Sequence, residues 1–299
     1  MQIDFIPDRT LFPFQSRWFD GAGPRIHYVD EGKGRAVLMF HGNPTWSFLY
    51  RKVINELAGE YRCIAMDYPG FGLSERPIGY GYTSEEHARV VGTLVDHLEL
   101  DNFIVVGQDW GGPIGMTVAL ERAKRVAGMV FANTWYWPAQ GSLTTFSLVM
   151  SSPPLQWLIL NRNAFVNFIM PRSVSTPLPP EVFKTYQDAQ PSPEARRGVA
   201  EFPRQIRRAR PMLERLAALA PKELGDKPIE LVWAMKDPAF GNAAVPARWK
   251  RDFPKANLTQ VSNANHYIQE DAPDAVAAAV RRVEGRLRGR VDSTELRRE

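Results

Sequence analysis

The stretch Gly107-Gln108-Asp109-Trp110-Gly111 has residue types and spacing suited to nucleophilic catalysis. It follows an apolar, β-prone run at 102–106 and precedes a segment with helical spacing at 114–120. A strand, a sharp turn and a helix make the geometry in which a central nucleophile projects above a sheet, and glycines permit the tight turn. Because the central residue is Asp109, whose reference pKa of about 3.9 leaves it ionised at neutral pH, the pattern predicts an ester intermediate. The alternative is a turn in which Asp109 only caps the following helix.

A nucleophile on such a turn requires a histidine base and an orienting acid later in the chain. His266 lies a few residues beyond the last predicted strand, 257–261, where the base is expected. Asp237 lies just after the preceding strand, 228–234, and is the predicted acid; its alternative role is that of a turn residue before a proline. The other candidates are badly placed for these roles: His27, His41, His87, His97, Asp226 and Asp252.

The elements that must position these residues alternate between strands and helices. Two short strands at 14–20 and 25–30, joined by a turn at 21–24, precede buried strands at 36–40, 61–66, 102–106 and 129–132. Helices are expected at 47–57, from a capping box that begins at Thr83 to about Leu98, and after the turn at Asp109. This alternation predicts an α/β fold with a mainly parallel sheet.

The alternation stops at about Pro138. From there to residue 216 the sequence is helical, rich in aromatic residues and interrupted by prolines, and strands resume only at 228. We therefore expect 138–216 to form a helical cap over the ligand-binding edge of the sheet, and 1–137 with 217–299 to form the core domain. The cap aromatics are expected to pack between the two parts. They are Phe146, Trp157, Phe165, Phe168, Phe183 and Tyr186.

Composition excludes several function classes. The 299 residues are 44% hydrophobic and 23% charged, without an apolar run long enough to cross a membrane and without a signal-peptide pattern at the start. The single cysteine, Cys63, rules out an intramolecular disulfide and favours a cytoplasmic location. The net charge of +4 comes with basic clusters at 204–210 and 281–298, which we interpret as solvated helix faces and a tail. No nucleic-acid or membrane partner is expected, and a homo-oligomer remains a possible form.

Four motifs together identify a family: His41-Gly42-Asn43-Pro44-Thr45-Trp46, Asp67-Tyr68-Pro69-Gly70-Phe71-Gly72, Gly107-Gln108-Asp109-Trp110-Gly111-Gly112 and Asn265-His266. With them the chain resembles the haloalkane dehalogenases of the α/β-hydrolase superfamily over nearly its whole length. The resemblance implies an eight-stranded, mostly parallel sheet flanked by helices, with a helical cap inserted after the sixth strand. It also implies that side-chain N–H groups of Asn43 and Trp110 hold a halide, and we expect their backbone N–H groups to form an oxyanion hole.

One position departs from the larger branch of that family. Asn133 stands where a glutamate orients the histidine, so the acid must be Asp237, and the chain resembles the branch that combines an Asp–His–Asp triad with an Asn/Trp halide pair. The resemblance implies hydrolysis of small hydrophobic haloalkanes to alcohol, halide and a proton, without a metal or organic cofactor. Because His266 must be neutral, activity is expected to fall below a pH of about 6.5.

Three other functions remain open. An epoxide hydrolase would use the same triad but needs acidic tyrosines from the cap, for which Tyr136 and Tyr186 are the candidates, and Asn43 argues against it. A coelenterazine-type luciferase on this scaffold is less favoured, since related ones keep the glutamate that Asn133 replaces. A non-catalytic small-ligand receptor could also keep the fold, although the intact order of the triad argues against it.

Overall fold

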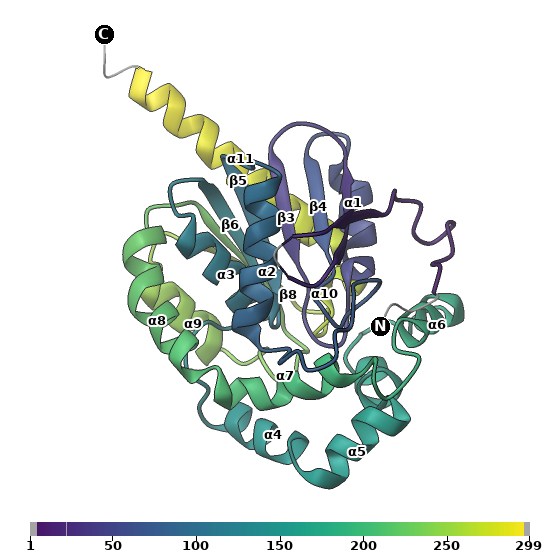
Figure 1. The fold of residues 1–299 in the computed structure, drawn as a ribbon. Coiled ribbons are helices and arrows are strands. Elements are labelled where there is room, and N and C mark those ends of the chain that lie inside the picture. The colour runs from purple at the N-terminus through teal and green to yellow at the C-terminus, as the bar shows by residue number, and fades with distance from the viewer. Residues whose placement is uncertain (1–4, 22, 296–299) are drawn as a thin grey trace.

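The computed structural model describes residues 5–21 and 23–295 of the chain. Within these residues eight strands form one open sheet in the order β1-β2-β4-β3-β5-β6-β7-β8 (Figure 1). β1 and β2 pair with each other and β2 pairs with β4 antiparallel, whereas all other pairs are parallel. The predicted mostly parallel, eight-stranded sheet is therefore confirmed. The strands are β1 Arg17–Phe19, β2 Ile26–Glu31, β3 Ala36–Phe40, β4 Arg62–Met66, β5 Phe103–Gln108, β6 Val126–Ala132, β7 Ile229–Ala234 and β8 Asn257–Val261.

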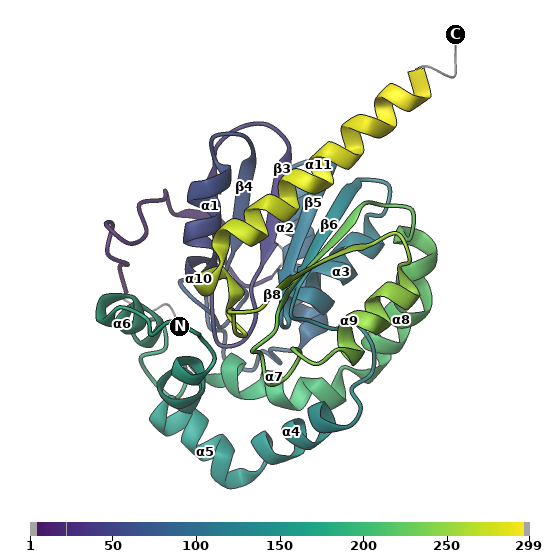
Figure 2. The same ribbon diagram turned by 180° about the vertical axis from the view of Figure 1, so that it is seen from behind.

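The central strands are mostly apolar because helices cover both faces of the sheet. Every residue of β3, β5, β6 and β7 is buried. Helices α2 (Ser84–His97) and α3 (Gly111–Glu121) lie on one face, and α1 (Arg51–Leu57) and α11 (Pro273–Glu295) lie on the other (Figures 1 and 2). The predicted capping box opens α2. The backbone N–H of Thr83 donates to the side chain of Glu86, and the backbone N–H of Glu86 donates to the side chain of Thr83.

Several predicted elements have different bounds in the structure, among them the first strand, expected at 14–20 and observed at Arg17–Phe19. The strand expected to stop at residue 106 continues through Gln108, because its backbone keeps pairing with β6 as far as Ala132. The helix expected at 47–57 begins as a 3-10 turn, η1 (Ser47–Tyr50), before α1. Two shorter helices lie between β7 and α11: α9 (Ala244–Asp252) before β8 and α10 (Ile268–Asp271) after it.

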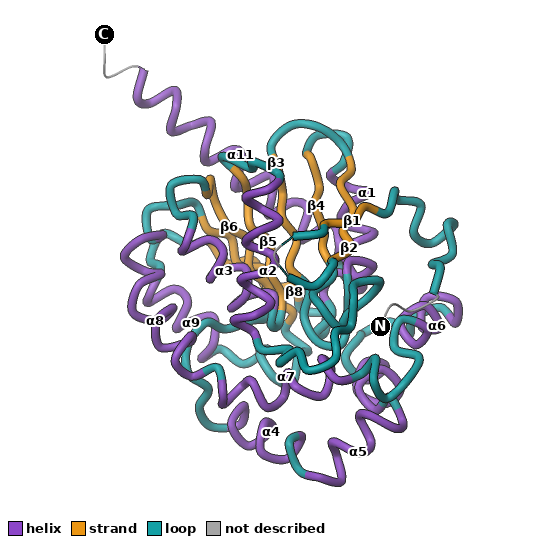
Figure 3. Tube along the Cα trace, viewed as in Figure 1, coloured by secondary structure: helices purple, strands orange, loops and turns teal. Residues whose placement is uncertain are grey.

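Between β6 and β7 the chain forms only helices, which gather on one side of the sheet (Figure 3). They are α4 (Ser142–Met150), α5 (Pro153–Arg162), η2 (Phe165–Ile169), η3 (Met170–Arg172), α6 (Pro180–Asp188), α7 (Arg197–Arg208) and α8 (Arg210–Leu224). The boundary predicted at 216 falls inside α8, which packs against α3. The division into core and cap at 138 and 216 therefore remains a prediction.

Ion pairs occupy much of the two basic clusters. Glu201 pairs with Arg204 and Arg208, and Glu230 pairs with Arg282 and Arg286. The pairs on α7 fit the predicted solvated face. The prediction is wrong for Arg282 and Arg286, because their partner Glu230 is fully buried on β7. The ends of the predicted N-terminal and C-terminal segments, 1–4 and 296–299, and residue 22 of the predicted turn lie outside the described residues. Among the residues that the structure does describe, no helix is long and apolar enough to cross a membrane.

Candidate active site

Asp109 occupies the sharp turn between β5 and α3. Its φ of 51° lies in the left-handed region, which residues other than glycine rarely adopt. Three hydrogen bonds hold its backbone there: its N–H donates to Asn133 O at 3.2 Å, and its carbonyl accepts from Gly112 N at 3.0 Å and from Thr134 Oγ1 at 2.5 Å. A Cβ at Gly107 would lie 2.5 Å from Gly111 O, and one at Gly111 would collide with Phe40 O. The prediction that glycines are required on both sides of Asp109 is confirmed.

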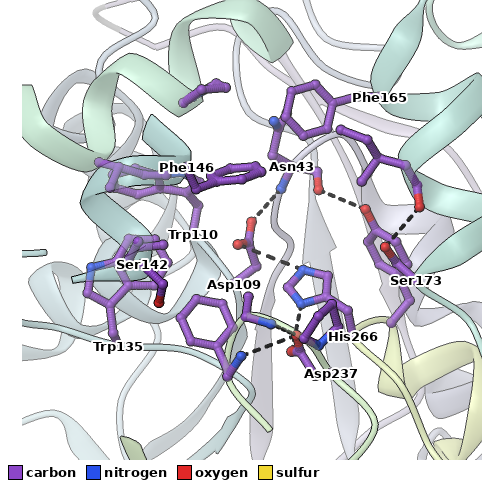
Figure 4. A pocket seen from close by; sticks show the side chains of 18 residues that line it. Asn43, Asp109, Trp110, Trp135, Ser142, Phe146, Phe165, Ser173, Asp237 and His266 are labelled. Carbon is purple, nitrogen blue, oxygen red and sulfur yellow. Dashed lines mark hydrogen bonds and ion pairs between the residues drawn. The ribbon is translucent and has the colours of Figure 1, made fainter. Parts of the chain in front are cut away.

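His266 and Asp237 lie beside this turn, on the loops after β8 and β7. His266 Nδ1 is 2.8 Å from Asp237 Oδ2, and His266 Nε2 is 3.8 Å from Asp109 Oδ2 (Figure 4). Asp237 is buried, and its Oδ1 accepts the backbone N–H groups of Ala239 at 2.8 Å and Phe240 at 3.2 Å. The structure thus brings together all three residues predicted to form the triad.

Asn133 has a role that the sequence did not reveal. Its Nδ2 donates to Asp237 Oδ2 at 2.9 Å and to Ala234 O at 3.0 Å, while its Oδ1 accepts Ala234 N–H at 2.7 Å. The side chain is fully buried, so these bonds fix both the amide and the carboxylate that it contacts. Where a glutamate would supply the charge, Asn133 instead holds the carboxylate of Asp237 in place.

The backbone N–H groups of Asn43 and Trp110 face the carboxylate of the nucleophile. Asn43 N–H donates to Asp109 Oδ1 at 2.8 Å. The Trp110 indole is 2% exposed, packed between Phe202, whose ring is stacked on it at 5.2 Å, and Trp135, whose ring meets it edge-on at 4.9 Å. The indole N–H donates to no described residue, and Trp110 lines the cavity beside Asp109. It is therefore a fixed donor without a partner.

A proline inside α7 leaves a backbone carbonyl free to accept a hydrogen bond from Asn43. Because Pro203 has no N–H, the carbonyl of Val199, four residues earlier, lacks its helical donor. That carbonyl accepts Asn43 Nδ2 at 3.3 Å. Helix α7 thus orients one of the two residues predicted to bind halide, and it does so through a backbone atom, which is why sequence inspection did not find it.

The charges of the triad shift one another's pKa values. Burial raises the pKa of Asp109, and this outweighs the lowering by the His266 charge and by the backbone N–H groups of Asn43 and Trp110. Burial alone would lower the pKa of His266, but the charge and hydrogen bond of Asp237, with the charge of Asp109, raise it above its ordinary value. Burial would raise the pKa of Asp237, yet its interactions with His266 hold it below the usual range.

A cavity of about 320 Å³ lies over Asp109 and is lined by both the sheet loops and the inserted helices. Its apolar walls include Leu143, Phe146, Phe165, Ile169, Ile206 and Phe240. The expectation that the cap aromatics serve packing holds for Tyr186, which packs edge-on against Phe48. It also holds for Phe165, which is buried in the main hydrophobic cluster and lines the cavity together with Phe146 (Figure 4). It is wrong for Phe146, Trp157 and Phe168, whose side chains are exposed.

The discarded candidates lie in other surroundings. Within the described part of the chain, His27 pairs with Asp67 at 2.9 Å, His41 and His87 are buried, and His97 is exposed. Asp226 pairs with Lys255 on the surface, and Asp252 pairs with Arg251 on α9. Burial lowers the pKa of His41 to about 4, so it stays neutral.

Two further residues at the site were missed by sequence inspection. Tyr267 lines the cavity and its hydroxyl donates to Asn43 O at 3.1 Å. Gln108, next to the nucleophile, donates from its side chain to His266. Their positions adjacent to Asp109 and His266 were the available signal, but adjacency alone does not tell whether a side chain turns toward the site.

Comparisons with known proteins agree with this geometry. The family described as "alpha/beta hydrolase fold" matches residues 35–273. "Haloalkane dehalogenase 2" of Mycobacterium bovis is 55% identical over 281 residues, which cover 94% of this chain and 98% of that protein. A more distant relative, the cis-3-alkyl-4-alkyloxetan-2-one decarboxylase of Xanthomonas campestris, is 30% identical and covers 87% of this chain and 92% of its own length.

Among solved structures, the haloalkane dehalogenase DbeA of Bradyrhizobium elkani superposes with a TM-score of 0.81 at 25% identity, covering 92% of this chain and 98% of that one. Fold, motifs and sequence identity agree across nearly the whole length. The chain belongs to the α/β hydrolase family and, within it, to the haloalkane dehalogenases.

Proposed function

We propose that this protein hydrolyses carbon–halogen bonds of small hydrophobic haloalkanes to an alcohol, a halide ion and a proton. The observation that carries the proposal is the placement of Asp109 at the floor of an apolar cavity, between N–H donors on one side and the His266–Asp237 pair on the other. An apolar wall suits a halogenated alkyl chain. The uncharged donors suit a halide that must also leave after the reaction.

In the first step Asp109 attacks the carbon that carries the halogen. Asn43 N–H occupies Oδ1 at 2.8 Å, and we therefore assign the attack to Oδ2. The new C–O bond forms as the carbon–halogen bond breaks, and the bonding pair leaves with the halide. Side-chain N–H groups of Trp110 and Asn43 would stabilise the negative charge that develops on the halogen, since fixed donors act where charge appears in the transition state.

In the second step water attacks the carboxyl carbon of the ester on Asp109. His266, neutral at Nε2 and oriented by Asp237, takes the proton from water. The backbone N–H groups of Asn43 and Trp110 would bind the oxyanion, with a contribution on the order of a hundredfold. Collapse of this intermediate releases the alcohol, restores the Asp109 carboxylate and returns one proton to solvent.

The hydrogen bonds of Tyr136 and Tyr186, the two candidate acids, weigh against an epoxide hydrolase. Tyr136 OH donates to Asp252 at 2.7 Å and Tyr186 OH donates to Glu270 at 2.7 Å, and neither residue lines the cavity. Tyr267, which does line it, already donates to Asn43 O. Among the described residues that line the cavity, no tyrosine is therefore left to protonate an epoxide oxygen.

The division of the chain is part of this proposal. We infer that 138–216 acts as a cap, because α4, η2 and α7 supply apolar walls to the cavity and separate Asp109 from bulk water. The reaction as written requires no metal or organic cofactor, and its partners are substrate, water and halide. We propose the cytoplasm as the location, in keeping with the single buried cysteine, Cys63.

Halide release from a panel of brominated and iodinated alkanes tests the function directly. We expect stoichiometric release of halide and alcohol, and expect Asp226→Asn, a surface control, to match the unaltered protein. Hydrolysis of epoxides to diols without halide release from any member of the panel would overturn the proposal.

The pH dependence should differ between the free protein and the ester. Asp109 raises the pKa of His266 by its charge, and esterification removes that charge. Because the base must be neutral, ester hydrolysis should decline as pH falls through the His266 pKa, with a midpoint below the titration midpoint of His266 in the free protein. Rapid-quench measurement of ester decay against pH, beside an NMR titration of His266, checks this order; a reversed order would contradict it.

A further inference from the structure

Gln108 ends β5, directly before the nucleophile, and its side chain reaches across to the loop that carries His266. The amide Nε2 lies 3.1 Å from His266 Nε2 and 3.0 Å from His266 O. Gln108 is fully buried. It therefore contacts the atom of His266 that is required to act as the base.

The second contact determines the orientation of the amide. A carbonyl oxygen such as His266 O can only accept a hydrogen bond, so the NH₂ group of Gln108 must face it. The other N–H of the same nitrogen then points to His266 Nε2, which must be the acceptor. This leaves the ring proton on Nδ1, where it is donated to Asp237 at 2.8 Å. Two independent partners thus specify one neutral tautomer of His266.

The oxygen atom of the Gln108 amide lowers the stability of the folded protein, because it is buried without a hydrogen-bond donor in the described part of the chain. Gln108 Oε1 is buried and has no hydrogen-bond partner among the described residues. Leaving a buried acceptor unpaired is unfavourable, and an apolar side chain of similar size would avoid this loss. Packing alone therefore does not explain an amide at this position.

We propose that Gln108 is a positioning residue for the hydrolysis of the ester: before water binds at Nε2 it holds the neutral, Nδ1-protonated tautomer of His266 and disfavours the imidazolium, and its N–H leaves Nε2 when water takes that place and gives up a proton. The inference rests on the proposed function. An imidazolium would direct its Nε2–H at the Gln108 N–H, and two donors facing each other repel. Gln108 thereby disfavours the charged His266 ring, which the carboxylates of Asp237 and Asp109 favour. One further titratable group lies beside His266 among the described residues: Tyr267, whose ring centroid is 4.9 Å from that of His266.

Two substitutions separate this role from a general effect on folding. Gln108→Glu keeps the shape of the side chain but replaces the donor by an acceptor, which would favour the imidazolium. We expect formation of the alkyl-enzyme to change less than about threefold, ester hydrolysis at neutral pH to slow by about tenfold or more, and its acid limb to move to higher pH. Gln108→Leu removes the donor without adding an acceptor. It should move the acid limb to higher pH by less than Gln108→Glu does, and slow hydrolysis at neutral pH correspondingly less.

A purely structural role predicts a different outcome. Both steps would then slow together, and the pH midpoint of hydrolysis would be the same in Gln108→Glu and Gln108→Leu. That result, or unaltered hydrolysis in Gln108→Glu, would overturn the inference.

A second measurement does not depend on turnover. Nitrogen NMR of the His266 ring in the resting protein should show the Nδ1-protonated tautomer, and Gln108→Glu should convert it to the doubly protonated form at a pH where the unaltered protein remains neutral. An absence of halide release together with this NMR result would refute the proposed function and leave the contact of Gln108 with His266 intact. An Nε2-protonated ring in the unaltered protein would refute the inference.

Discussion

His266→Ala is expected to stop the reaction after the first step and to leave the alkyl group of the substrate on Asp109. The reason is that His266 contacts Asp109 only through Nε2, at 3.8 Å, and is required for proton removal from water but not for attack on carbon. Loss of a general base lowers turnover by about 10²–10⁴-fold. Intact-protein mass spectrometry should detect one added alkyl group per chain, and one halide ion should be released per chain.

The matched control for this experiment is His97→Ala, which removes an exposed histidine on α2. It should keep full turnover and an unmodified mass. Peptide mapping of His266→Ala should place the adduct on Asp109. An unmodified protein after incubation with a substrate that the unaltered enzyme converts would refute the ester mechanism.

Asp109→Asn is expected to abolish both steps, since an amide is too weak a nucleophile to displace a halide and no ester can form for water to attack. A loss of about 10⁴-fold or more in turnover is expected when a nucleophile is removed. The same substitution removes one of the charges that raise the pKa of His266, so the NMR titration midpoint of this histidine should fall. Halide release and the titration of His266 are therefore the two measurements.

These two readouts distinguish loss of the nucleophile from misfolding. A misfolded protein would lose halide release but would show His266 titrating near its ordinary value, without the contact to Asp237. Asp226→Asn, which removes a surface carboxylate, should change neither readout. An Asp109→Asn protein that still releases halide at a substantial rate would require another nucleophile.

The sequence was sufficient for the fold and for the three residues proposed to carry out the chemistry. Their signals are local: glycines on both sides of Asp109 permit a turn that would otherwise clash, and apolar runs such as 36–40 identify buried strands. The order of Asp109, Asp237 and His266 along the chain then predicts their convergence, because parallel strands end at one edge of a sheet. In the structure Phe40 is in register with Gly107, which brings Asn43 next to Asp109.

Only the tertiary structure shows what holds these residues in place. Asn133 was recognised as a missing charge, but its hydrogen bond to Asp237 depends on how β6 and β7 lie together. The Val199 carbonyl that orients Asn43 is a backbone atom released by Pro203, and no side-chain pattern marks it. Gln108 stands beside Asp109 in the sequence, yet its partner lies 158 positions further along the chain.

The physical reason for this difference is the range of the interactions involved. Turns, caps and strand periodicity depend on neighbours within a few residues and are therefore written in the sequence. Hydrogen bonds between side chains of different loops, and the placement of Phe146 and Phe165 in the wall of the cavity, depend on distances set by the packing of whole elements. The sequence determined that Asp109 is presented as a nucleophile, and the tertiary structure decided how His266 and the N–H donors are held around it.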